Sequence, residues 1–349
     1  MTLAELARLA GVSRTTASYV LNGQGEARRI KRDTIDHVLA VARAHDFRLD
    51  TQAAALRGGA SRTLGFILPD LENTSYARLA KRLEQGARAR GYQLLIAGSD
   101  DDPATERALA LALKARRCDA LIVASALPDG DRFYLDLQAE GLPVVAVDRA
   151  QSPGQIRCVL SDNAGAATEL TRSVLTPTTR RVAWLDAVPE LAMTRDRRQG
   201  FLAAMPPEHQ PWLYSGAHYD RASGAAMARQ MLDEQGLPDA LITASFTLLQ
   251  GVLDVWLERP GGLPETVALA TFGDDRLLEF LPVPVNSLPQ DHDAIAAATL
   301  EQALAAIEAQ RQGAPAGPVP PVTINRSLTQ RRASGQPASN HQDGSSERT

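Results

Sequence analysis

The sequence has little of what marks a membrane-spanning, exported or disulfide-bonded protein. Its two cysteines, Cys118 and Cys158, lie far apart and neither has a CxxC partner. We therefore expect both to be small buried hydrophobic side chains rather than a disulfide. No run approaches the roughly 20 apolar residues of a membrane span. The charged Glu5 and Arg8 interrupt the apolar stretch that a signal peptide needs, so we expect a cytoplasmic location and no membrane partner.

Recognised catalytic and metal-binding motifs are also missing. The six histidines form no HExxH or other paired metal spacing, and there is no Walker loop, no GxSxG elbow and no GxGxxG after a strand. We therefore expect no metal and no cofactor, and nothing in the sequence supports an enzyme.

Positive charge is scarce overall but is concentrated at one end. The whole chain carries a net charge of −4, yet residues 1–62 contain ten basic and six acidic side chains. This end therefore carries +4 and the remainder −8. A basic head on an acidic body is typical of a regulator whose attraction to nucleic acid phosphates is confined to one region.

The first 22 residues predict a helix-turn-helix. Thr2 and Glu5 have the spacing of a capping box, Gly11 ends the first helix, and Ser13 can cap a second. In this motif the N-terminal residues of the second helix enter the major groove of DNA. Arg14 could grip guanine O6 and N7 together, and Thr15 could contact a base edge or a thymine methyl. The alternative is a solvated helical hairpin whose polar residues only face water.

The candidate DNA contacts are polar side chains of this motif and of the loop after it. They are Thr2, Ser13, Arg14, Thr15, Thr16, Ser18, Tyr19, Asn22, Arg28 and Arg29.

The pattern of apolar residues predicts four segments. Residues 1–48 form the helix-turn-helix head, completed by a third helix from about Arg32 to His45, and residues 49–62 form a short helix and linker. From Thr63 apolar strands alternate with helices, which predicts parallel sheets covered on both faces and a body of two doubly wound lobes over 63–332. Residues 333–349 are polar, and we expect them to be disordered.

Polar residues follow the predicted strands of the body. Ligands of doubly wound sheets bind beyond the carboxyl ends of the strands. Carboxylates and amides suit sugar hydroxyls, whereas arginine forks suit phosphates. The residues chosen on this ground are Asp70, Asn73, Asp148, Arg149, Ser245 and Asp274, with Asp186 at another strand end.

Three stretches resemble the LacI family of bacterial repressors, and in particular its fructose-repressor group. They are GVSRTTASYVLNG at 11–23, GFILPDLENTSY at 65–76 and SFTLLQGVLDVW at 245–256. The resemblance implies a periplasmic-binding-protein-like body whose chain crosses between the lobes three times. It also implies that residues 50–58 form a hinge helix that orders on operator DNA and inserts Leu56 into the minor groove.

The resemblance also implies site residues and partners. Arg197, which precedes Gly200 and Phe201 in an RxxGF pattern, would contact an effector, as would Asp274, Gln290 and the aromatic Tyr219. The implied effector is fructose 1-phosphate, and the implied assembly is a homodimer, possibly a tetramer, on a near-palindromic double-stranded operator.

Three other interpretations remain open from the sequence. They are a sugar-phosphate enzyme using the same cleft, an exported sugar receptor, and a LacI-type regulator whose effector is a purine or an unphosphorylated sugar.

Overall fold

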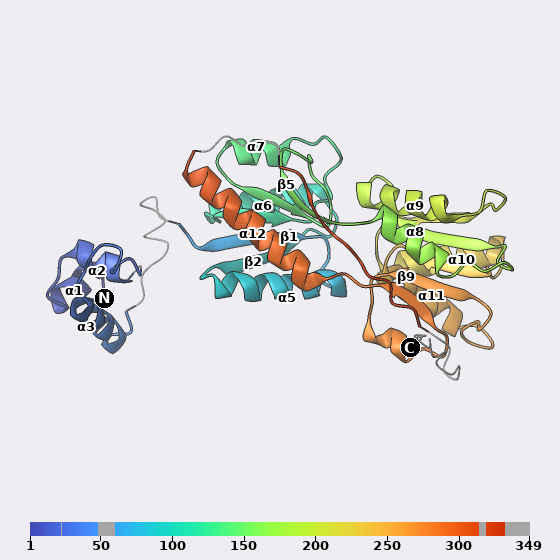
Figure 1. Cartoon of the computed structure of the whole chain (residues 1–349), viewed down its shortest axis with the longest axis horizontal. Coiled ribbons are helices and arrows are strands. Elements are labelled where there is room, and N and C mark those ends of the chain that lie inside the picture. Colours follow the sequence, from blue (N-terminus) through green and yellow to red (C-terminus); the bar gives the residue numbers. More distant parts are fainter. Residues whose placement is uncertain (22, 48–59, 314–318, 332–349) are drawn as a thin grey trace, which may run out of the picture. The chain divides into compact units, whose positions relative to one another are not determined.

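The computed structural model describes residues 1–21, 23–47, 60–313 and 319–331. The chain forms two compact units, Met1–Ser61 and Arg62–Thr349 (Figure 1). Among the helices of the described ranges, none is long and apolar enough to cross a membrane.

The first unit is a three-helix head made of α1 (Leu3–Leu9), α2 (Arg14–Leu21) and α3 (Arg32–Ala44). The predicted capping box is formed, because Glu5 N–H donates to Thr2 Oγ1 and Thr2 N–H donates to Glu5 Oε2. Its core consists of Ala7, Ala10, Ala17, Val20 and Val38. The three helices thus meet through the predicted apolar stripes, although Lys31 gives α3 no side-chain cap.

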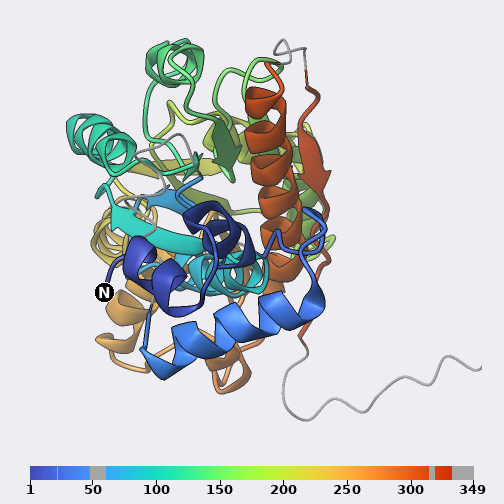
Figure 2. The same ribbon diagram turned by 90° about the vertical axis from the view of Figure 1, so that its left-hand side faces the viewer.

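The first lobe of the body is a parallel sheet in the order β11-β5-β4-β3-β1-β2. Its strands are β1 (Thr63–Leu68), β2 (Gln93–Gly98), β3 (Ala120–Val123), β4 (Val144–Val147), β5 (Arg157–Ser161) and β11 (Val322–Ile324). Helices α5 (Thr74–Ala89) and α12 (His292–Arg311) cover one face, and α6 (Pro103–Ala115) and α7 (Phe133–Ala139) cover the other. Figure 2 shows α12 running beside β11.

The second lobe repeats this architecture with the strand order β10-β9-β8-β6-β7. Its strands are β6 (Val182–Ala187), β7 (Trp212–Gly216), β8 (Ala240–Thr243), β9 (Ala268–Phe272) and β10 (Val285–Leu288). Its helices are α8 (Ala164–Arg172), α9 (Ala192–Ala204), α10 (Arg221–Glu234) and α11 (Phe246–Leu257), with the 3-10 turn η1 (Arg276–Glu279). Trp184 stacks on Phe201 at 4.8 Å and meets Phe272 edge-on at 6.4 Å in its core.

The chain passes between the lobes three times, as predicted. It crosses after β5, again after β10, and finally after β11. The third crossing is residues 325–331, which we call the strap (Figure 1). Thr329 exchanges two backbone hydrogen bonds with Ser287 of β10, at 2.9 and 2.8 Å, so the strap is fixed to the second lobe.

Several element boundaries differ from the predicted ones for a common reason. Helices α6 and α11 begin two residues before the expected Thr105 and Leu248, because Asp102 and Ser245 cap them there. Strands β5 and β7 and helix α7 were not predicted. Each is only five to seven residues long, and β7 is a partly exposed edge strand, so the periodic signal is weak.

Candidate functional site

The head presents a polar surface at the start of α2. Arg14 and Thr15 are exposed at the first two positions of this helix, as a reading helix requires. Ser13 accepts a hydrogen bond from Thr16 N–H at 3.0 Å, and the hydroxyls of Ser13 and Thr16 lie 2.8 Å apart. These two hydroxyls therefore fix the helix start beside Arg14.

The remaining head candidates extend this surface. Thr2 caps α1 and is exposed, whereas Ser18 and Tyr19 are half-buried one turn along α2. The exposed guanidinium of Arg28 lies 4.8 Å from the centroid of the Tyr19 ring, and Arg29 is also exposed. The predicted contacts Asn22 and Leu56 lie outside the described residues, as does the predicted hinge helix.

A pocket enclosing about 940 Å³, its open mouth included, lies between the two lobes at the carboxyl ends of their strands. All nine predicted effector residues line it: Asp70, Asn73, Asp148, Arg149, Arg197, Tyr219, Ser245, Asp274 and Gln290. Asn73 caps α5 and Ser245 caps α11, so the N-termini of one helix from each lobe face the pocket. Such helix ends favour negative charge.

Asp148 is the centre of a network on the first lobe. It follows β4 with φ of +64°, and its Oδ2 accepts from the Tyr76 hydroxyl at 2.9 Å while its Oδ1 accepts from Gln290 Nε2 at 2.8 Å. Burial opposes its charged form, but Arg197 and Arg326 outweigh this effect and lower the pKa of Asp148. Asp148 therefore remains an anion between two guanidinium groups.

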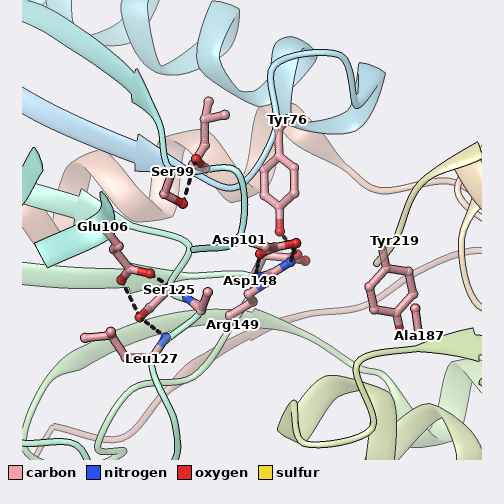
Figure 3. Close-up of polar contacts among 12 residues, drawn as sticks. Tyr76, Ser99, Asp101, Glu106, Ser125, Leu127, Asp148, Arg149, Ala187 and Tyr219 are labelled. Atoms are coloured by element: carbon pink, nitrogen blue, oxygen red, sulfur yellow. Dashed lines mark hydrogen bonds and ion pairs between the residues drawn. The ribbon is translucent and has the colours of Figure 1, made fainter. Parts of the chain in front are cut away.

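Arg149, 4% exposed, is committed to a neighbouring carboxylate. It forms a two-pronged ion pair with Asp101, which follows β2. Figure 3 shows this pair beside the Tyr76–Asp148 contact, with Tyr219 of the second lobe opposite. Because its charge is already balanced, Arg149 is poorly placed to supply net positive charge to a ligand.

Arg197, also 4% exposed, is held on three sides. Its Nε donates to Asn163 Oδ1 and its Nη1 to the Ala244 carbonyl, both at 2.8 Å. Its guanidinium carbon lies 4.5 Å from the centroid of the Phe272 ring. These contacts fix its remaining edge toward the pocket.

The second lobe also contributes fixed hydroxyl and carboxylate groups. The Tyr219 hydroxyl and Thr194 Oγ1 lie 2.7 Å apart, and burial raises the pKa of Tyr219. Asp274 Oδ1 accepts from Ser287 Oγ and from Arg331 Nη2 of the strap, each at 2.7 Å. The carboxylate of Asp274 is thus oriented by both β10 and the strap.

Several lining residues were missed by sequence reasoning. Tyr76, Asp101, Phe272, His292 and Arg326 all contribute to the pocket wall. Asp101 and Arg326 follow strands β2 and β11, so the rule that selected the other strand-end residues would have found them. His292 lies where the chain re-enters the first lobe, and Ser75 Oγ lies 3.0 Å from its Nε2.

Asp186 is a correction to the strand-end rule. It follows the pattern in sequence but is fully buried, and it accepts hydrogen bonds from Trp184 Nε1, Ser215 Oγ and both Nε and Nη2 of Arg198. The charge of Asp186 is therefore used within the second lobe and is not presented to the pocket. Among the described residues, no cluster of three or more potential metal ligands is present.

A helix-turn-helix head joined to a two-lobed body with an interlobe pocket defines a ligand-responsive DNA-binding regulator. Residues 2–49 match the bacterial regulatory proteins of the lacI family, and residues 61–272 match the periplasmic binding proteins and sugar binding domain of the LacI family. The chain belongs to the LacI family of transcription regulators.

Named relatives are similar over most of the chain. The fructose operon regulatory protein of Vibrio cholerae is 52% identical over 305 residues, which are 87% of this chain and 93% of that protein. The catabolite repressor/activator of Escherichia coli strain K12 is 43% identical over 317 residues, covering 90% and 95% of the two chains. These relatives are regulators, and sequence-specific control of transcription is the function they share with this chain.

Solved structures agree. The Cra transcriptional dual regulator from Pseudomonas putida, crystallised in complex with fructose 1-phosphate, is 48% identical, with a TM-score of 0.73 covering 78% of this chain and 99% of that one. The Lac repressor bound to ONPG has a TM-score of 0.78 over 95% of this chain at 18% identity, which supports the fold alone.

Proposed function

We propose that this regulator binds a near-palindromic operator as a homodimer and releases it when fructose 1-phosphate enters the interlobe pocket. The observation that carries the proposal is a pocket whose wall combines sugar-binding carboxylates with two buried arginines that lack a carboxylate of their own. Its likeness to the Pseudomonas putida protein crystallised with fructose 1-phosphate supports the same effector.

Each part of the chain has a role in this proposal. Residues 1–48 bind DNA, and residues 49–62, with Leu56 in the minor groove, link the head to the effector-binding body of 63–332. Asn73, Asp148, Ser245 and Asp274 would bind sugar hydroxyls, because carboxylate and amide groups are the usual partners of such hydroxyls. Closure of the lobes on the effector would favour the state that releases DNA, and we propose that it acts in the cytoplasm.

The test is a fluorescence-anisotropy titration of the protein on a near-palindromic operator taken from upstream of a fructose-uptake operon. We expect tight binding that fructose 1-phosphate releases and free fructose does not. Tight binding that ignores fructose 1-phosphate would refute the effector and retain the DNA-binding function.

A matched head variant checks the origin of the sequence preference. Arg14→Ala should reduce discrimination against a single wrong base pair by about 1–3 kcal/mol, because a forked donor is lost from the reading helix. Arg8→Ala, an exposed arginine on α1, should leave this discrimination unchanged. Equal discrimination by the Arg14→Ala variant and the unmodified protein would contradict the assignment of α2 as the reading helix.

A further inference from the structure

The strap carries a buried arginine into the effector pocket. Arg326 is 9% exposed and lines the pocket beside residues of both lobes. Its position is fixed on either side, since Ile324 accepts a backbone hydrogen bond from Asp162 at 3.1 Å and Thr329 pairs with Ser287. The side chain is therefore held at the pocket by the third crossing between the lobes.

The hydrogen-bonding capacity of Arg326 is largely unused. Its Nη1 donates to the Leu288 carbonyl at 3.3 Å, and its buried Nε has no acceptor in the part of the chain that the structure describes. A buried donor without a partner costs about 1–3 kcal/mol. Its guanidinium carbon lies 5.4 Å from the Phe272 centroid, a contact that stabilises the cation but does not replace a hydrogen bond.

The charges around Arg326 are unbalanced. Arg197 lies over the same Phe272 ring, whereas Arg149 is neutralised by Asp101 and Arg331 by Asp274. Burial, followed by the charge of Arg197, lowers the pKa of Arg326 to about 9, even though Asp148 and Asp162 act in the opposite direction. An anion placed beside these two guanidinium groups would relieve both the burial cost and their mutual repulsion.

We propose that Arg326 binds the phosphate group of the effector together with Arg197, and that it thereby selects phosphorylated over unphosphorylated sugars. The inference rests on the proposed effector, but it adds a residue and a basis for selectivity. A guanidinium presents several donors in one plane and matches the oxygens of a phosphate better than it matches single sugar hydroxyls.

The first experiment uses inorganic phosphate, so that it does not depend on the sugar. Thermal unfolding of the full-length protein is compared in phosphate and in chloride at equal ionic strength, for the unmodified protein and for Arg326→Gln. The matched control is Arg229→Gln, an exposed arginine on α10 whose side chain is 57% exposed. We expect phosphate to raise the Tm of the unmodified protein and of Arg229→Gln, and to leave that of Arg326→Gln unchanged.

The second experiment measures fructose 1-phosphate binding by calorimetry and the titration of the bound phosphate by 31P NMR. Loss of a charged hydrogen-bonding partner predicts an affinity about 10- to 100-fold lower in Arg326→Gln. It also predicts that the pKa of the bound phosphate is lowered in the unmodified protein and returns toward its free value in the variant. Arg326→Lys retains the charge without the fork, and should lie between the two.

The outcomes separate the two proposals. An equal response of the unmodified protein and Arg326→Gln to phosphate, or an affinity loss with no change in the phosphate titration, would overturn the role of Arg326. A phosphate response that depends on Arg326, with fructose 1-phosphate binding no tighter than phosphate itself, would support that role and refute the effector.

Discussion

At the scale of single residues, Arg197 joins the effector pocket to the framework of the second lobe. Its Nε and Nη1 are bound to Asn163 and Ala244, and its remaining edge faces the pocket. We expect Arg197→Ala to bind operator DNA within about twofold of the unmodified protein, because the head is untouched, and to lose release by fructose 1-phosphate.

Two measurements are needed for Arg197→Ala. Anisotropy gives operator affinity with and without effector, and thermal unfolding reports the cost of leaving the Ala244 carbonyl unpaired, about 1–3 kcal/mol. Arg195→Ala is the control, because Arg195 is half exposed and pairs with Asp129 at the surface. Normal release by the Arg197→Ala variant would contradict the pocket assignment.

Asp239 makes a pH-dependent contribution to the second lobe. Its carboxylate accepts from Arg181 Nη2 at 2.6 Å and from the backbone N–H groups of Arg180 and Arg181, each at 2.9 Å. The hydrogen bond from the Arg181 side chain is the largest cause that lowers the pKa of Asp239 to about 2 from 3.8. Because the folded-state value is depressed, the stabilisation is complete above about pH 4 and is lost as the pH falls toward 2.

The measurement is denaturant unfolding of the unmodified protein and Asp239→Asn at several pH values. We expect the variant to be less stable at pH 7 and the difference to shrink between pH 4 and pH 2. Asp233→Asn, at an exposed position of α10, should change stability by less than about 0.5 kcal/mol. A difference for Asp239→Asn that stays constant across this range would exclude the ionised carboxylate as its cause.

At the scale of elements, Gly200 allows α8 and α9 to pack closely. A Cβ at this position would lie 2.1 Å from the Ala164 carbonyl oxygen, so the two helices would have to separate. We expect Gly200→Ala to destabilise the body by about 3 kcal/mol or more, at the upper end of overpacking. Gly98→Ala is the control in unfolding measurements, because its Cβ would meet nothing closer than 4.0 Å. Equal stability of the two variants would show that the helices can adjust.

This glycine indicates what the sequence could predict and what it could not. The RxxGF pattern selected Arg197 by resemblance, and the structure places that arginine in the pocket while Gly200 serves helix packing. Capped helices and long apolar strands were predictable because their signals are local. Arg326 was missed because its burial depends on the strap pairing with β10, a contact between residues far apart in sequence.

At the scale of the whole molecule, the pocket is built from both lobes and from all three crossings between them. Asp148 of the first lobe is bonded to Gln290 on the second crossing, and Asp274 of the second lobe to Arg331 on the third. Asn163, on the first crossing, holds Arg197. A ligand that contacts these groups therefore acts on the segments that set the relative position of the lobes.

Effector and operator must then oppose each other reciprocally. If fructose 1-phosphate weakens operator binding by a given factor, the operator weakens fructose 1-phosphate binding by the same factor, because the two equilibria share one thermodynamic cycle. Couplings of this kind are usually about 5- to 150-fold. Calorimetry of fructose 1-phosphate binding with and without a saturating operator duplex, compared with anisotropy of operator release, measures both sides of the cycle. An operator duplex with scrambled half-sites is the control. Unequal factors would mean that the effector displaces DNA by a route other than the coupling of one pocket to one head.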